Sequence, residues 1–150
     1  MRRDGGFTLV ELLVVFAIMA LLIGITPIAY QKMRDTAQYR DVVRTMVSEL
    51  RAARQQAAST HAETRFSVNL QQRSYGLQGR SEHPLPESLT VRATVAGTEL
   101  SAEGVAAIRF LADGGATGGS IDLVRSGGSG GVRLQVDWLS GRVSQEALLP

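Results

Sequence analysis

The sequence predicts an α+β fold in which a long N-terminal helix, first hydrophobic and then amphipathic, packs on an antiparallel β-sheet. Three observations lead to this prediction. Residues 12–31 carry no charge, residues 32–61 repeat apolar side chains at steps of three and four, and residues 62–150 alternate apolar with polar side chains between glycine-rich turns. The chain has no cysteine among its 150 residues, which excludes a disulfide scaffold, a thiolate zinc site and a cysteine nucleophile.

The uncharged segment is long enough to cross a bilayer. As an α-helix, residues 12–31 would measure about 30 Å, the thickness of a bilayer core. The short segment before it contains Arg2 and Arg3, and positive charge favours keeping that side cytoplasmic. We therefore predict one membrane-spanning helix over residues 7–31, with the bulk of the chain across the membrane. A cleaved secretory signal peptide is the alternative, but an A-x-A-like site after the apolar run is missing.

Glu11 is an unusual residue because it lies inside this apolar stretch. A carboxylate at bilayer depth costs about 2.5–3.5 kcal/mol unless it is paired. One interpretation places Glu11 near the helix start, where it reaches the headgroups and favours the positive helix end. In the other, Glu11 pairs with a cation, and a cut after Gly6 would supply one as the free amine of Phe7.

Two further residues predict an irregularity in the same helix. Pro27 removes one helical hydrogen bond and clashes with the preceding turn, and Gly24 loosens that turn. We predict a kink or local melting near the outer end of the membrane helix.

Residues 6–13, Gly-Phe-Thr-Leu-Val-Glu-Leu-Leu, resemble the prepilin cleavage and methylation signal of type IV pilins and type II secretion pseudopilins. The resemblance implies that a prepilin peptidase removes leader 1–6 by cutting between Gly6 and Phe7, and then N-methylates Phe7. It also implies that Glu11 pairs with the Phe7 amine of a neighbouring subunit and sets the filament register. The helix is then expected to anchor the chain in the bacterial inner membrane, N-terminus cytoplasmic, and later to form the filament core.

Residues 32–61 have the pattern of an amphipathic stalk helix, with six basic and three acidic side chains. The predicted apolar face consists of Met33, Ala37, Val43, Met46, Val47, Leu50, Ala53 and Ala57. The basic face is either simply solvated or in contact with phospholipid or nucleic acid.

The head, residues 62–150, is predicted to contain six or seven short antiparallel strands, with a loop at Pro84 and Pro86. The glycine-rich segments around residues 113–119 and at Gly141 are expected to be turns that need positive φ angles. The predicted strand residues are Phe66, Val68, Leu70, Tyr75, Leu77, Leu89, Val91, Ala93, Val95, Ile108, Phe110, Ile121 to Val124, Val132, Leu134, Val136, Trp138 and Val143.

The segment 110–119, the Ile-Asp-Leu at 121–123 and the sequence from Val136 to Val143 resemble the head of the H-type pseudopilin (GspH) and its pilus relative FimT. The resemblance spans most of the chain and is weakest over residues 81–106. It implies a minor pseudopilin of type II secretion, near the tip of a periplasmic filament, that helps to drive exoprotein export. The implied partners are prepilin peptidase, other major and minor pseudopilins and the inner-membrane assembly platform.

The alternative implied by the resemblance is a FimT-like minor pilin that acts in pilus priming or DNA uptake. DNA binding requires a basic patch, yet the head has eight basic and nine acidic residues. DNA-binding FimT relatives are expected to carry a second arginine after the Gly-Arg pair, and here only the Arg of Gly141-Arg142 is present. A local patch for DNA contact would consist of Arg109, Arg125, Arg133 and Arg142.

No residue pattern indicates an enzyme, a cofactor or a metal site. His61 and His83 lie far apart without a ligand-spaced partner, and each is expected at the surface or in a hinge. The glycine-rich segment 113–119 has no lysine and precedes a strand, which argues against a phosphate loop, and it lacks the oxygen ligands of an EF-hand. No nucleophile elbow is present.

Overall fold

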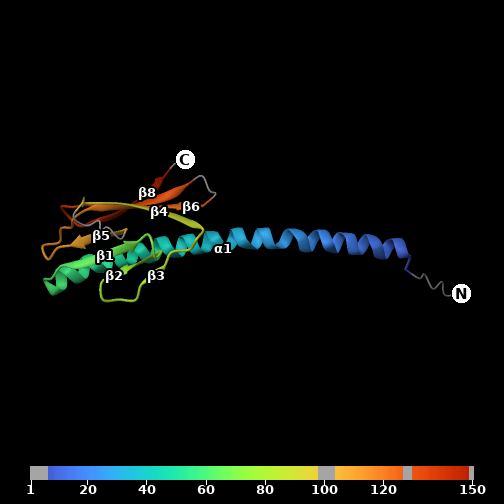
Figure 1. The fold of residues 1–150 in the computed structure, drawn as a ribbon, viewed down its shortest axis with the longest axis horizontal. Helices are drawn as coiled ribbons and strands as arrows, with labels where there is room; N and C mark the ends of the chain where they lie inside the picture. The colour runs from blue at the N-terminus through green and yellow to red at the C-terminus, as the bar shows by residue number, and fades with distance from the viewer. Residues whose placement is uncertain (1–6, 98–103, 127–129, 149–150) are drawn as a thin grey trace. The chain divides into compact units, whose positions relative to one another are not determined.

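A computed structural model describes residues 7–97, 104–126 and 130–148, with the side chains of residues 24–30 and Lys32 left out. One α-helix is followed by eight strands in this part of the chain (Figure 1). The chain divides into two compact units, residues 1–37 and residues 38–150, which we call the N-terminal unit and the head unit. The predicted leader 1–6, including Gly6, lies outside the described residues.

Helix α1 runs from Leu9 to Thr60. Its start is fixed by Thr8, whose Oγ1 accepts a hydrogen bond from the backbone N–H of Glu11 at 3.3 Å. The backbone is helical through Gly24 and Pro27, so the two predicted segments form one continuous element. The bend or melting at these two residues stays a prediction.

The strands form two four-stranded antiparallel sheets. The first sheet has the order β3 (His83–Pro84), β2 (Ser74–Leu77), β1 (Thr64–Asn69), β5 (Val105–Phe110). The second has the order β4 (Leu89–Val95), β6 (Gly119–Arg125), β7 (Gly131–Val136), β8 (Val143–Leu148). The α+β class is confirmed, but the head contains two sheets where one was predicted. The chain leaves the first sheet after β3, forms β4 of the second, returns to the first for β5 and completes the second with β6 to β8. β3 lies where a loop was predicted.

The head core forms where one face of α1 meets both sheets. The buried helix residues are Val42, Val43, Met46, Val47, Leu50, Ala53 and Ala57. The predicted apolar face is therefore confirmed from Val43 to Ala57. It is wrong for Met33, which is 74% exposed, and for Ala37, because both belong to the N-terminal unit and have no sheet to cover them within it.

Alternation correctly predicted most strand residues that face the core, including Phe66, Ile108, Ile121 and Leu134. Leu70 and Trp138 are exceptions. Both follow the last residue of their strand and are exposed. The expected positive φ angles are confirmed among the described glycines, at 92° for Gly114, 73° for Gly118, 145° for Gly119 and 59° for Gly141, although Gly119 is the first residue of β6 and not part of a turn.

Candidate assembly interface

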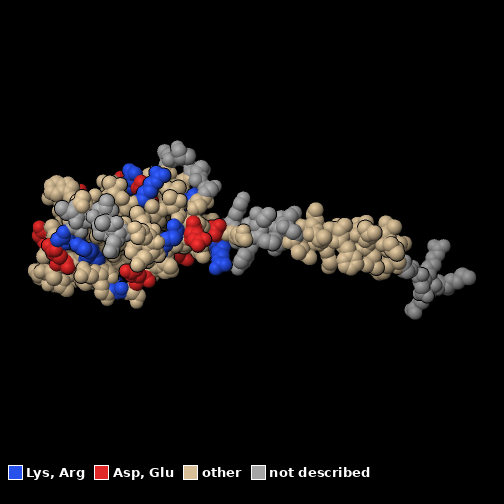
Figure 2. Space-filling view, in the orientation of Figure 1, with Lys and Arg blue, Asp and Glu red and all other residues tan. Residues whose placement is uncertain are grey.

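The described N-terminal part of α1 is an apolar surface without a partner inside its own unit. Every described side chain from Phe7 to Ile23 is exposed, and the exposed fraction is 80% at Leu9 and 63% at Phe16. On the face of this segment visible in Figure 2, the described atoms are uncharged. A continuous apolar surface of this length marks a contact with protein or lipid.

Glu11 lies in the first turn of this apolar helix, and its side chain is exposed. The backbone N–H of Leu12 donates to the carbonyl oxygen of Thr8 at 3.2 Å, so Thr8 closes the helix start with both its main chain and its side chain. Thr8 and Glu11 have the spacing of a capping box, which is a structural reason for this pair of residue types. No described cation pairs with the Glu11 carboxylate, so it remains available at the edge of the apolar surface.

Phe7 precedes the first helical residue and is 82% exposed. A free amine at Phe7 would therefore stand beside the positive end of α1, in the same turn as Thr8. Among the side chains that the structure describes, no helical stretch is both long enough and apolar enough to cross a membrane. The predicted span 7–31 also includes residues 24–30, whose side chains lie outside this description.

The four arginines predicted as a possible DNA patch have separate environments. Arg109 lies on β5 in the first sheet and forms an ion pair with Glu63 at 3.1 Å. Arg125 ends β6 and lies over the Tyr39 ring, 5.5 Å from its centroid. Arg133 lies on β7 and Arg142 directly precedes β8, so the second sheet carries three of the four arginines and the first sheet carries Arg109.

Arg133 on β7 is engaged by Asp122 on the neighbouring strand β6. Its Nε and Nη2 donate to the two carboxylate oxygens at 2.7 and 2.8 Å. This bidentate hydrogen bonding holds the pKa of Asp122 below its ordinary value. The Arg133 charge is therefore already neutralised by an internal partner. Arg142, in the turn before β8, forms no ion pair among the described residues, although its charge contributes to the low pKa of Asp137.

A polar contact missed by the sequence analysis joins α1 to β3. His83 Nε2 lies 3.0 Å from Glu49 Oε1, and the Glu49 side chain is 10% exposed. The His83 ring also stacks near Tyr75 at 5.4 Å, and burial raises the pKa of Tyr75. In the sequence, Glu49 lies between Met46 and Ala53 on the predicted buried face of the helix. This position alone could have indicated a buried carboxylate that needs a polar partner. His83, expected at the surface or in a hinge, is half-exposed and ties the helix to the first sheet.

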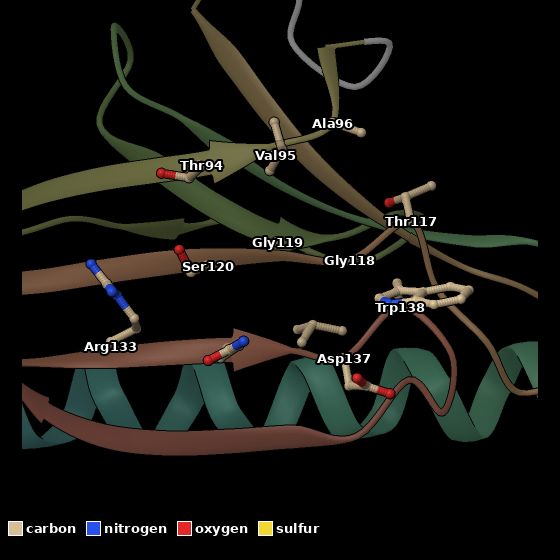
Figure 3. Close-up of a pocket in the computed structure, with 12 residues that line it drawn as sticks. Thr94, Val95, Ala96, Thr117, Gly118, Gly119, Ser120, Arg133, Asp137 and Trp138 are labelled. Atoms are coloured by element: carbon tan, nitrogen blue, oxygen red, sulfur yellow. The ribbon is translucent and has the colours of Figure 1, made fainter.

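A hollow of ≈ 440 Å³ lies where β4 and β7 end (Figure 3). Trp138 stands beside Gly118 in this view, and its side chain is 66% exposed. The absence of a side chain at Gly118 lets Trp138 approach this closely, since a Cβ at Gly118 would lie only 3.0 Å from the Cβ of Trp138. Asp137 accepts hydrogen bonds from both the N–H and the hydroxyl of Ser140, which fix the turn that carries Trp138 and hold the pKa of Asp137 low.

The architecture is that of pilin-like subunits, as two solved structures show. The chain superposes on the type IV minor pilin FimU of Pseudomonas aeruginosa with a TM-score of 0.54 and 16% identity, covering 76% of this chain and 92% of that one. It superposes on the minor pseudopilin EpsH from the type 2 secretion system of Vibrio cholerae with a TM-score of 0.56 and 12% identity, covering 75% of this chain and 98% of that one. These likenesses establish the fold.

Sequence comparison identifies the family. Residues 1–26 match the prokaryotic N-terminal methylation motif, and residues 42–141 match the type II transport protein GspH. The type II secretion system protein H of Xanthomonas campestris is 35% identical over 142 residues, covering 95% of this chain and 83% of that protein. The chain belongs to the GspH family of pseudopilins. The alternative, a FimT-like pilin, is not favoured by these matches.

Proposed function

We propose that this chain assembles as a minor subunit into the periplasmic pseudopilus of a type II secretion system, near its tip, and helps to drive exoprotein export. The observation that carries the proposal is the exposed apolar surface from Phe7 to Ile23 in a member of the GspH family. Such a surface is stable only when it is covered, and lipid and then neighbouring helices would cover it in turn. The proposal includes no catalytic step and no cofactor.

The same surface supports a proposal for membrane anchoring. Before assembly, the helix over residues 7–31 would hold the chain in the bacterial inner membrane, with the N-terminus cytoplasmic and the head periplasmic. The N-terminal methylation motif supports this order of events, because it implies processing at the membrane by prepilin peptidase. The proposed partners are this peptidase, the other major and minor pseudopilins and the inner-membrane assembly platform.

The proposed processing removes leader 1–6 and methylates Phe7. The new amine would lie close to its own Glu11, which is four residues away, and to the Glu11 of a neighbouring subunit. In a filament core with little water, the pairing of ammonium and carboxylate would offset the cost of burying each charge. A stagger between subunits that brings Glu11 of one chain to Phe7 of the next would therefore be preferred over other registers.

The N-terminal mass of the membrane form tests the processing. In cells with active prepilin peptidase, we expect a chain that starts at Phe7 and carries one added methyl group. An unprocessed chain that starts at Met1 in those cells would contradict the proposal. The matched control is a strain without the peptidase, in which the Met1 form should accumulate.

The Glu11→Ala variant separates processing from assembly. We expect normal cleavage after Gly6, because the leader and the cleavage site are intact, but a loss of incorporation into filaments, because the Phe7 amine has no carboxylate partner. The measurement is the ratio of this chain to the major pseudopilin in sheared filaments, with Thr8→Ser as a control that keeps the helix cap. Normal incorporation of Glu11→Ala would refute the pairing role.

A further inference from the structure

Two adjoining hollows lie between the exposed side of α1 and strand β8, with volumes of ≈ 500 and ≈ 590 Å³. They form one groove, because Arg51 and Gln55 line both of them. The other residues used below are Arg44, Ser48 and Gln145 in the first hollow and Arg54, Arg142 and Val143 in the second. We call this feature the α1–β8 groove, and it lies entirely within the head unit.

The helix wall of the groove is the flank of α1 at the edge of the core, where the exposed Arg44 and Arg51 adjoin the buried Val47. Arg44, Ser48, Arg51 and Gln55 follow one another at steps of four, three and four, so they form one stripe along the helix. On the strand wall, Val143 and Gln145 belong to the face of β8 that continues the core-facing side of β7. The register places Val143 opposite Val136 and Gln145 opposite Leu134.

The groove is positively charged and has no acidic residue in its lining. Arg44, Arg51 and Arg54 are exposed and form no ion pair with any described residue. The Arg54 side chain lies close to the turn before β8, since its Cδ and Nε would be 3.3 Å from a Cβ built on Gly141. On the face of the head visible in Figure 2, by contrast, basic and acidic side chains are interspersed. A row of like charges without counter-charges is unfavourable and favours an anionic ligand.

The strand wall also has a free edge. β8 pairs with β7 on one side, and no described strand pairs with its other side. The middle residues of β8, from Ser144 to Ala147, are exposed. Alternate backbone N–H and C=O groups along this edge therefore have no partner in the ladder and can accept an added strand. Glu146 is opposite Arg133 and belongs to the other face of the sheet, so it does not oppose an anion in the groove.

We propose that the α1–β8 groove binds an extended acidic segment of a partner protein, which adds to the free edge of β8 and places carboxylates against Arg44, Arg51, Arg54 and Arg142. The strand edge would give affinity through main-chain hydrogen bonds, and the arginines would give specificity for alternate acidic side chains. A nucleic acid backbone would satisfy the arginines, but it has no amide groups to complete the strand edge. The two features together therefore favour a polypeptide.

Binding of a model peptide to the full chain in detergent micelles tests the proposal. The probe is a fluorescent peptide as long as β8 with alternating Glu and Thr, and the readout is fluorescence anisotropy over a series of salt concentrations. We expect saturable binding that weakens as salt screens the charges. The same peptide with Gln in place of Glu should bind with an affinity about tenfold lower, or lower still. Equal binding of both peptides would overturn the proposed charge recognition.

Variants locate the binding in the groove. Arg51→Glu combined with Arg142→Glu should weaken binding of the acidic peptide about tenfold or more, and the milder pair Arg51→Gln and Arg142→Gln should weaken it in the same direction. Arg80→Glu is the matched control, because Arg80 is exposed on the head but does not line the groove, and it should keep nearly full affinity. An equal loss in Arg80→Glu would show nonspecific attraction and would contradict the proposal.

A chemical change in the probe tests the strand addition. N-methylation of alternate peptide nitrogens removes backbone donors while it keeps every carboxylate, so it should weaken binding about tenfold. Unchanged binding would mean that charge alone holds the peptide and would overturn strand addition.

A competition experiment distinguishes a polypeptide from a nucleic acid ligand. The competitor is duplex DNA at the same total charge as the peptide. If DNA fails to displace the peptide, the result supports a polypeptide ligand. If DNA displaces the peptide completely and depends on the same arginines, the polypeptide ligand is overturned in favour of a nucleic acid.

Discussion

Gly119 begins β6 at a point where the backbone of β4 comes too close for a side chain. A Cβ at Gly119 would lie 2.8 Å from the carbonyl oxygen of Thr94, and the φ angle of 145° belongs to a region that other residues rarely adopt. Thr94 and Ser120 are opposite each other in the register of these strands, so this close approach occurs inside the ladder of the second sheet. The fold therefore depends on a missing side chain at this position.

Gly119→Ala should lower the free energy of unfolding of the head by about 1–3 kcal/mol, because the new Cβ adds a steric clash to an unfavourable φ angle. The measurement is chemical denaturation of the full chain in detergent, followed through the signal of Trp138. Gly97→Ala is the matched control. No described atom lies within 4 Å of a Cβ there, so its change should stay within about 0.5 kcal/mol. Equal stability of both variants would contradict this account of Gly119.

Asp122→Asn should reduce the sensitivity of the head to acid. The ordinary carboxyl pKa is 3.8, and hydrogen bonds from Arg133 lower the pKa of Asp122 in the folded state. A lowered carboxyl pKa stabilises the fold above the unfolded value, and this contribution is lost as the pH falls through the folded value. The wild type should thus lose more thermal stability between neutral and acidic pH than Asp122→Asn does.

The control for this prediction is Asp41→Asn, which removes an exposed carboxylate that forms no ion pair among the described residues. Thermal unfolding of the three proteins over a pH series makes the comparison. Asp41→Asn should follow the wild type. If Asp122→Asn did the same, the contact with Arg133 would not contribute to acid stability.

At the scale of elements, α1 serves two surfaces with one continuous helix. Its first part exposes apolar side chains on every described face, whereas its later part buries one apolar face among the sheets of the head. Leu50 and Met46 are fully buried in that face. The packing of this face, rather than helix propensity, is what holds the later part of α1 in the head.

Leu50→Ala should destabilise the head by about 2–5 kcal/mol, because it removes buried methyl groups and leaves a cavity between α1 and the sheets. Gln55→Ala, one turn later on the exposed side, is the control and should change stability by less than about 0.5 kcal/mol. Denaturant unfolding of the full chain compares the two. Similar losses in both variants would mean that the buried face has been assigned incorrectly.

The elements also show how far the sequence alone leads. The buried positions between Val43 and Ala57 were predictable, because helical spacing is a local property of the chain. The division into two sheets was not, because strand pairing depends on contacts between distant residues. Glu49 and His83 are 34 positions apart, so neither residue by itself indicates the pair. The α1–β8 groove was missed for the same reason, since its arginines looked like an ordinary solvated helix face.

For the whole molecule, the average composition conceals two segments of very different charge content. The residues from Leu12 to Gln31 are uncharged, whereas the head from Ala62 onward has eight basic and nine acidic residues. The N-terminal motif was predictable because its chemistry depends on a few adjacent residues. The four arginines suggested as a basic patch did not predict a DNA-binding surface reliably, because the fold pairs Arg109 and Arg133 with acidic residues distant in the sequence.

The most direct test of the proposed role is to delete the gene in a strain that has both a type II secretion system and type IV pili. We predict that exoproteins accumulate inside the cells, that the wild-type chain restores their export and that the Glu11→Ala chain does not. Pilus assembly and DNA uptake should remain unchanged in the same strains. Normal exoprotein export after the deletion, together with a loss of pili or of DNA uptake, would contradict the account.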